Sequence, residues 1–220
     1  MSDALAYTSF YGIHRGMPCV VCGCGRSLNQ VDEVRGAIVI GVNDVGRRTC
    51  PDYLVVVDDE HSMAGERWWF VAHSRAKYVF APFELHLRHS IAVRLVLGEY
   101  GGTAIERESG IPITQNSPYV AVCLAAYMGA SRIGLLGVDF RDDHFYGPTG
   151  RHPLTQHVQM IDQQYRALCR ALEYRDTELI NLSLDSALVS LPKCSIATFC
   201  DTASGVGPHT DPDDIAPYQG

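Results

Sequence analysis

The chain has 220 residues, of which 46% are apolar and 20% are charged, and its formal net charge is −7. This length suits one α/β domain with a sizeable core, and the composition excludes an intrinsically disordered protein. The acidic balance argues against broad binding to nucleic acids, because such binding relies on a basic face.

The sequence predicts a cytoplasmic protein with no membrane span. It lacks an apolar run of about 18 residues, and its first residues lack the charged and apolar regions of a secretion signal. Most of the eight cysteines lie in apolar stretches. This is typical of free, buried thiols in a reducing compartment rather than of disulfides.

Short apolar runs alternate with helical patterns along the chain, which predicts a Rossmann-like, doubly wound α/β fold. We expect a mostly parallel sheet with helices on both faces. The expected strands are 19–22, 37–42, 53–57, 77–80, 132–137 and 179–182. The expected helices are 27–34, 89–97, 117–128 and 154–172. Residues 1–198 would form a single nucleotide-binding domain, and 199–220 a flexible tail.

A glycine turn, Gly23-x-Gly25-x-Ser27, follows the first expected strand. Glycine lets a backbone approach an anion, and the N-terminus of a helix favours phosphate. We therefore expect the turn, through Leu28, to bind the phosphate of a nucleotide, with Ser27 capping the helix. The turn lacks the third glycine of the dinucleotide fingerprint and the lysine of a P-loop, so a plain tight turn is the alternative.

Polar residues also follow the next two expected strands. Ligands of open parallel sheets bind beyond the carboxyl ends of the strands, so we expect Asn43, Asp44 and Asp58 to contact a nucleotide. Loop or cap roles are the alternative. Asp58 and Asp59 together would hold Mg²⁺ with a diphosphate, or would bond a ribose hydroxyl.

The segment after the strand at 132–137 supplies the candidate catalytic residues Asp139, His144 and Tyr146. A histidine is the usual general base near neutral pH, and Tyr146 would donate a proton to the leaving phosphate. Asp142 and Asp143 are expected to raise the pKa of His144, which would make it a poorer base. A surface histidine is the alternative, and His152 and His157 are weaker candidates.

Five stretches follow one another along the chain: CVVCGCGRSLNQVD, AIVIGVNDV, PDYLVVVDDE, NSPYVAVCLAAYMGASRIGLLGVDF and HFYG. With ELINLSLDSALVSLP they resemble a family of prophage and bacterial proteins grouped with the archaeal 6-hydroxymethylpterin diphosphokinases. More distantly, they are similar to the family 42 sialyltransferases. The resemblance covers about Pro18 to Pro192.

The resemblance to the sialyltransferases implies a nucleotide site that binds a cytidine monophosphate donor. The matching positions are Gly23, Gly25, Ser27, Asn43, Asn116 and Ser117, with His144 as the base. Cys24 and Arg26 depart from the turn of that family, which leaves the identity of the nucleotide open.

We therefore expect a glycosyltransferase that uses a small-molecule nucleotide or nucleotide-sugar donor. An ATP- and Mg²⁺-dependent diphosphokinase and a non-catalytic, phage-related binding or assembly protein are the alternatives. The sequence does not identify the acceptor, the metal dependence or the oligomeric state. A homo-oligomer is one of the alternatives.

Overall fold

The computed structural model describes residues 5–63, 65–151 and 153–203. Within these ranges eight strands form one sheet, in which every neighbouring pair is parallel. In spatial order they are β1 (Leu5–Ala6), β6 (Ile91–Arg94), β5 (Tyr78–Ala81), β4 (Tyr53–Val55), β3 (Ile38–Val42), β2 (Pro18–Cys22), β9 (Arg132–Leu136) and β10 (Glu178–Asn181). A separate parallel pair consists of β7 (Leu97–Tyr100) and β8 (Ile111–Ile113).

The central strands of the large sheet are buried on both faces, and alternate residues of a strand point to opposite faces. Cys19 and Val21 of β2 pack into one apolar core, whereas Val20 and Cys22 pack into the other. This explains why the strands are continuous apolar runs rather than alternating patterns.

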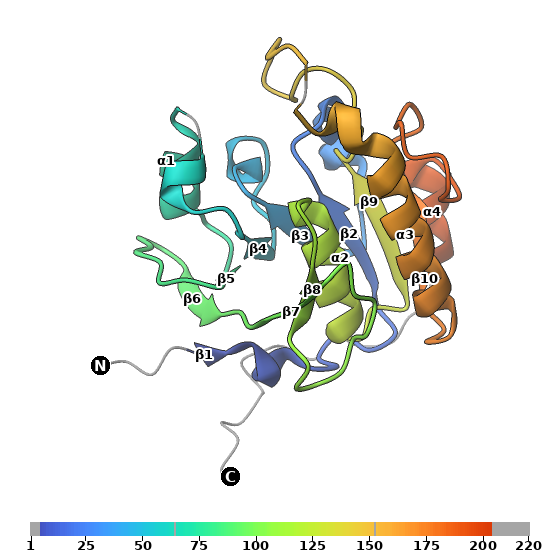
Figure 1. Cartoon of the computed structure of the whole chain (residues 1–220), viewed down its shortest axis with the longest axis horizontal. Coiled ribbons are helices and arrows are strands. Elements are labelled where there is room, and N and C mark those ends of the chain that lie inside the picture. Colours follow the sequence, from blue (N-terminus) through green and yellow to red (C-terminus); the bar gives the residue numbers. More distant parts are fainter. Residues whose placement is uncertain (1–4, 64, 152, 204–220) are drawn as a thin grey trace.

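Helices cover each face of the sheet (Figure 1). The first face carries η1 (Tyr7–Phe10), α2 (Ser117–Tyr127) and α3 (Val158–Glu173). The second carries η2 (Arg26–Glu33), η3 (Val45–Arg47), α1 (Arg67–Ala72) and α4 (Ile196–Ala203). Two further 3₁₀ helices are η4 (Glu60–Ser62) and η5 (Pro153–His157). The expected doubly wound α/β fold is confirmed.

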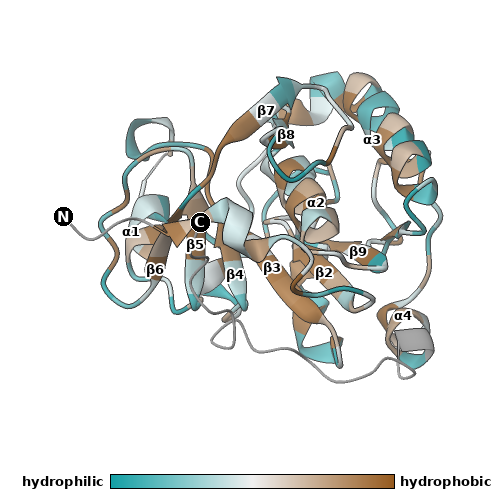
Figure 2. Ribbon diagram, turned by 90° about the horizontal axis from the view of Figure 1, so that it is seen from below, coloured by the Kyte–Doolittle hydropathy of each residue, from teal (hydrophilic) through white to brown (hydrophobic). Residues whose placement is uncertain are grey.

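Helix α2 is apolar on all sides because it lies between two layers. Its inner side packs on the sheet, and the segment that contains β7 and β8 covers its outer side. The hydroxyl of Tyr119 donates to the carbonyl of Gly102, at 2.9 Å, and that of Tyr127 to the carbonyl of Arg107, at 2.9 Å. Figure 2 shows the contrast with α3, whose turns alternate between hydrophobic and hydrophilic residues.

Two expectations about local structure are wrong. The helix expected at 89–97 is replaced by β6 and the start of β7. Ile91 and Val93 are β-branched, and β6 extends the sheet by pairing with β5, which outweighs any helical pattern there. Residues 199–203, which were expected to belong to a flexible tail, are part of α4; residues 204–220 lie outside the described part of the chain.

The order of the strands reverses between β2 and β9. From β2 the chain moves outward through β3, β4, β5 and β6, and it then returns to the other side of β2 as β9. Ligands of such sheets bind beyond the carboxyl ends of the strands at this point of reversal. The segments after β2 and β9 therefore define where a site is expected.

None of the helices in the described ranges has the length and apolarity that a membrane crossing needs.

Phe199 tests whether α4 belongs to the folded domain. Its side chain is fully buried and packs in the second core beside Leu182 and Ile196. Replacing Phe199 with Ala should lower the free energy of unfolding by about 3–5 kcal/mol, measured by urea denaturation. Val189→Ala, at a side chain that is 76% exposed, is the control and should change it by less than about 0.5 kcal/mol. An equally small effect of Phe199→Ala would place α4 outside the cooperative unit.

Candidate functional site

A cavity of 420 Å³ lies at the carboxyl ends of the central strands, beside the point of strand reversal. Its walls come from the ends of β2, β3 and β4, the start of α2, and the segment that follows β9. The polar side chains that line it are those of Cys24, Asn43, Asp58, Ser62, Arg67, Gln115, Asn116, Ser117, Asp139, Arg141, Asp143 and His144. Residues far apart in the sequence thus meet at one edge of the sheet.

The structure brings together about half of the expected site residues. Those that line the cavity are Gly25, Asn43, Asp58, Asn116, Ser117, Asp139 and His144. Those that lie behind or beside it are Gly23, Ser27, Leu28, Asp44, Asp59 and Tyr146. Several residues of the second group hold cavity-lining residues in place and do not line the cavity themselves.

Asn43, Asp58 and Ser117 form the polar floor of the cavity. The Asn43 amide nitrogen lies 3.4 Å from the Ser117 hydroxyl and 3.5 Å from Oδ2 of Asp58. The Ser117 hydroxyl donates to the same Asp58 oxygen at 3.2 Å. Asn43 has a φ of 53°, in the left-handed region that asparagine tolerates. Its buried Oδ1 finds no hydrogen-bond donor within the described residues, so this oxygen can accept from a ligand.

The N-terminus of α2 faces the cavity through residues 115–118. Asn116 occupies the N-cap position of the helix, and its side chain does not cap it. The Asn116 amide is buried and donates to the Tyr165 hydroxyl at 2.9 Å, so its side chain braces α2 against α3. The Ser117 hydroxyl instead belongs to the polar floor. The helix presents the positive end of its dipole to the cavity, whereas Pro118 has no N–H group and the N–H of Tyr119 donates to the Asn116 carbonyl at 3.0 Å.

The glycine turn after β2 is bonded to β9 rather than open to a phosphate. The N–H of Gly23 donates to the carbonyl of Leu136 at 2.7 Å, and that of Gly25 to the carbonyl of Gly137 at 2.8 Å. A Cβ at Gly25 would lie 2.5 Å from Oδ2 of Asp139. The glycines allow two backbone segments to approach closely, which corrects the expectation that their N–H groups cradle a phosphate.

Ser27 and Asp139 clamp this turn to the segment after β9. The Ser27 N–H donates to Oδ2 of Asp139 at 2.8 Å, and the Ser27 hydroxyl donates to Oδ1 at 2.6 Å. The Ser27 hydroxyl also accepts from the N–H of Gly137 at 2.8 Å and lies 2.6 Å from the Ser183 hydroxyl. Ser27 therefore does not cap a helix. Asp139 positions the turn and is not placed as a catalytic group, and Leu28 is fully buried in the second core.

Asp44 is buried and binds Arg67, a residue that no sequence motif marks as part of a site. The Arg67 guanidinium contacts Oδ1 of Asp44 through two nitrogens, each at 2.8 Å. The carboxylate is completely inaccessible to solvent, whereas Arg67 lines the cavity. Asp44 thus orients a cation toward the site instead of contacting a ligand itself, which corrects its expected role.

Asp58 and Asp59 have different roles: Asp58 belongs to the polar floor, whereas Asp59 caps a helix. Oδ1 of Asp59 accepts from the N–H and the hydroxyl of Ser62, at 2.9 Å and 2.7 Å, and so caps η4. These bonds lower the pKa of Asp59. In the part of the chain that the structure describes, no three His, Cys, Asp or Glu side chains are grouped to hold a metal ion. The residues present do not fit a preformed Mg²⁺ site.

His144 reaches the cavity from the loop after β9. Its Nδ1 lies 2.6 Å from the Thr149 hydroxyl, and its ring stacks on Tyr146 with centroids 5.2 Å apart. Burial lowers the pKa of His144, as does the charge of Arg67, and these effects outweigh Asp44 and Asp143, which raise it. The expectation from the sequence, that acidic neighbours raise the pKa of His144 and so make it a poorer base, is therefore wrong. At neutral pH the imidazole is uncharged and can accept a proton.

The remaining candidates lie outside the cavity. Tyr146 is 39% exposed, and the Arg47 guanidinium lies 4.4 Å from the centre of its ring. Burial, together with the charge of Asp44, raises the pKa of Tyr146, so its phenol is protonated at neutral pH. His157 is exposed at the end of η5 and does not line the cavity. His152 lies outside the described residues.

The fold resembles that of a known glycosyltransferase. The structure of the MAf glycosyltransferase from Magnetospirillum magneticum AMB-1 matches 95% of this chain with a TM-score of 0.53 and 13% sequence identity. This chain covers 39% of that protein's chain. Such a distant likeness shows a shared fold alone. No protein-family model matches the sequence, and no curated protein does. The expected relation to diphosphokinases and sialyltransferases stays a prediction.

The pKa of His144 provides a test of this electrostatic arrangement. Arg67→Met should raise that pKa, because the variant loses a cation that lowers it and leaves Asp44, which raises it, with only the more distant Arg47 as a charged partner. Titration of the imidazole resonances by NMR measures the change. Arg67→Lys keeps the charge and should leave the pKa below the ordinary value. Arg48→Met, which breaks a surface pair with Asp32, should have no effect. An unchanged pKa in Arg67→Met would show that Arg67 does not act on His144.

Proposed function

We propose that this protein is a glycosyltransferase that binds a nucleotide-activated sugar in the cavity beside the strand reversal. The observation that carries the proposal is the convergence of three features on that cavity. They are the polar floor of Asn43, Asp58 and Ser117, the Arg67 guanidinium, and a neutral His144. The fold shared with a glycosyltransferase is consistent with this function.

The polar floor suits the ribose of the donor. Asp58 is exposed and its carboxylate can accept from a pair of hydroxyls, while the unsatisfied Oδ1 of Asn43 can accept from a third donor group. A carboxylate beyond a parallel strand is the usual partner of a ribose hydroxyl in dinucleotide-binding folds. We therefore assign the nucleoside end of the donor to the side of the cavity formed by β3 and β4.

The phosphate of the donor is assigned to Arg67 and the start of α2. Arg67 remains charged at every physiological pH, and Asp44 fixes its orientation. The positive end of the α2 dipole adds a second source of positive potential. Both features are fixed before the reaction, so they can stabilise the charge that develops on the leaving phosphate.

His144 then acts as the general base. The imidazole takes the proton of an acceptor hydroxyl as the acceptor oxygen bonds to the anomeric carbon of the sugar. The bond between that carbon and the phosphate oxygen breaks, and its electron pair leaves with the nucleotide. Thr149, at Nδ1, limits the rotation of the imidazole. Because Asp59 caps η4, the acidic pair that would favour a diphosphokinase is not assembled in the structure.

Replacing His144 with Ala tests the catalytic assignment. The variant should lower kcat for hydrolysis of the donor by about 10²- to 10⁴-fold, because a positioned base contributes that much. The Kd for the donor should change little, since the interaction is made only in the transition state. Release of nucleotide from CMP-, UDP- and GDP-sugars provides the measurement.

The matched control is His157→Ala, at an exposed histidine outside the cavity, which should retain the wild-type rate. If His144→Ala turns over as fast as the wild type, His144 has no part in the reaction. If the wild type releases nucleotide from none of these sugars, the proposed activity itself is contradicted.

A further inference from the structure

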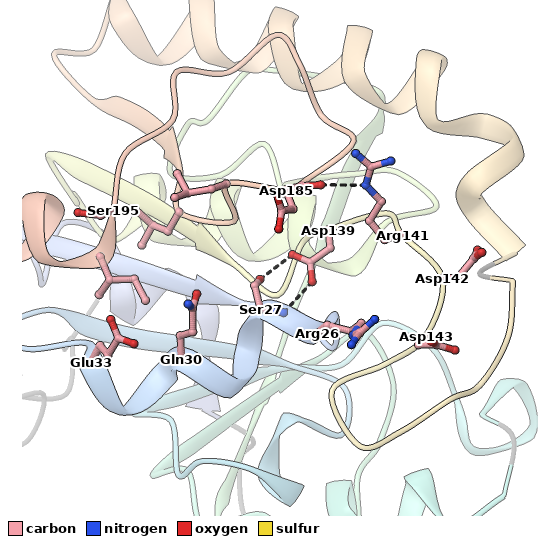
Figure 3. Close-up of a pocket in the computed structure, with 13 residues that line it drawn as sticks. Arg26, Ser27, Gln30, Glu33, Asp139, Arg141, Asp142, Asp143, Asp185 and Ser195 are labelled. Carbon is pink, nitrogen blue, oxygen red and sulfur yellow. Dashed lines mark hydrogen bonds between the residues drawn. The ribbon is translucent and has the colours of Figure 1, made fainter.

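A second and larger cavity, of 820 Å³, lies on the other side of the Ser27–Asp139 clamp. Figure 3 shows it between η2, the loop after β9 and the segment between β10 and α4. The residues that line it are Arg26, Ser27, Gln30, Glu33, Asp139, Arg141, Asp142, Asp143, Leu182, Leu184, Asp185, Ser195 and Ile196. The proposed donor site uses none of these as a ligand-binding group.

The two cavities share a wall. Asp139, Arg141 and Asp143 line both of them. These residues belong to the segment that leads directly to His144, so the second cavity adjoins the cavity that His144 lines. A transferase needs a second substrate at such a position, because its acceptor must reach both the base and the anomeric carbon.

The charges of the second cavity oppose the binding of an anion. Five carboxylates line it, against two guanidinium groups. The Arg141 Nε already donates to the carbonyl of Asp185 at 2.8 Å, which lowers its capacity to bind an anion. Carboxylates that are exposed to a cavity accept hydrogen bonds, and they therefore favour hydroxyls or ammonium groups.

Apolar side chains complete the lining of the second cavity. Leu182 and Ile196 are buried at its edge, whereas Leu184 is 58% exposed. Gln30 and Ser195 add uncharged hydrogen-bonding groups on opposite walls (Figure 3). An apolar surface surrounded by carboxylates, an amide and a hydroxyl matches a sugar ring, which has a face of C–H groups and a rim of hydroxyls.

We propose that this second cavity binds the acceptor, and that the acceptor is a neutral or amino-substituted carbohydrate. The assignment rests on the proposed function for the reaction, but binding of a carbohydrate in this cavity is a separate property. It can therefore be measured without donor or turnover.

The test measures binding of lactose and chitobiose to the whole chain by saturation-transfer NMR at millimolar concentrations, with sialyllactose as the anionic comparison. The neutral sugars should bind more tightly than sialyllactose. Glu33→Lys combined with Asp185→Lys should weaken the binding of the neutral sugars by roughly tenfold or more, because the lysines replace hydrogen-bond acceptors on two walls. Asp201→Lys, an equivalent charge change on α4 outside the cavity, should not weaken it.

Leu184→Trp provides a second variant that fills the cavity without changing its charge. It should also weaken binding of the neutral sugars, whereas Val189→Trp, at another exposed position outside the cavity, should not. Neither cavity variant should alter the binding of nucleotides, which reports on the first cavity.

Three results would overturn the assignment. The first is that neither neutral sugar binds to the wild type, and the second is that both cavity variants bind the sugars as tightly as the wild type. The third is that a serine-containing peptide displaces the sugars and that the cavity variants abolish its binding, because a peptide would then be the occupant. Failure of the proposed function would instead appear as a wild type that binds no nucleotide. The two failures are therefore distinguishable.

Discussion

The candidate site depends on the clamp between Ser27 and Asp139, which joins the turn after β2 to the segment after β9. These strands are neighbours in the sheet but more than a hundred residues apart in the chain. Two hydrogen bonds to one carboxylate, and a third from Gly137 to the same serine hydroxyl, fix the segment that carries His144. A charged acceptor strengthens such bonds, and the absence of a Cβ at Gly25 gives the carboxylate the space it needs.

A second buried interaction places the positive charge of the site. Asp44 has no exposed surface, and its charge is compensated chiefly by Arg67, at 2.8 Å, with Arg47 at 3.8 Å from its other oxygen. Removing one partner of such a pair costs about 3–5 kcal/mol in general, because the other is left buried and uncompensated. The pair brings α1 to the end of β3 and leaves the guanidinium at the cavity, where it also lowers the pKa of His144. Fold and electrostatics are thus set by the same contact.

The sequence predicted the sheet well because buried parallel strands are continuous apolar runs bounded by turns. It also located Asn43, Asp58 and His144, since polar residues after such strands converge at one edge. It did not identify Arg67, which reaches the site only through packing of α1, and no local motif marks that contact. The hydrogen bonds between the glycine turn and β9 depend on tertiary structure and cannot be recognised in the sequence. The turn was therefore expected to bind a phosphate. The same limit explains the helix expected at 89–97, where pairing with β5 decides the outcome.

The central claim is that the first cavity binds the nucleotide of a sugar donor. Calorimetric titration with CMP, UDP, GDP and ATP, each with Mg²⁺ and with EDTA, tests it most directly. We predict that CMP, UDP or GDP binds one to one, that EDTA leaves its affinity unchanged, and that Asp58→Lys abolishes binding by obstructing the polar floor. A nucleotide-sugar site in this cavity is contradicted if none of the nucleotides binds, if only ATP binds and requires Mg²⁺, or if Asp58→Lys binds as tightly as the wild type.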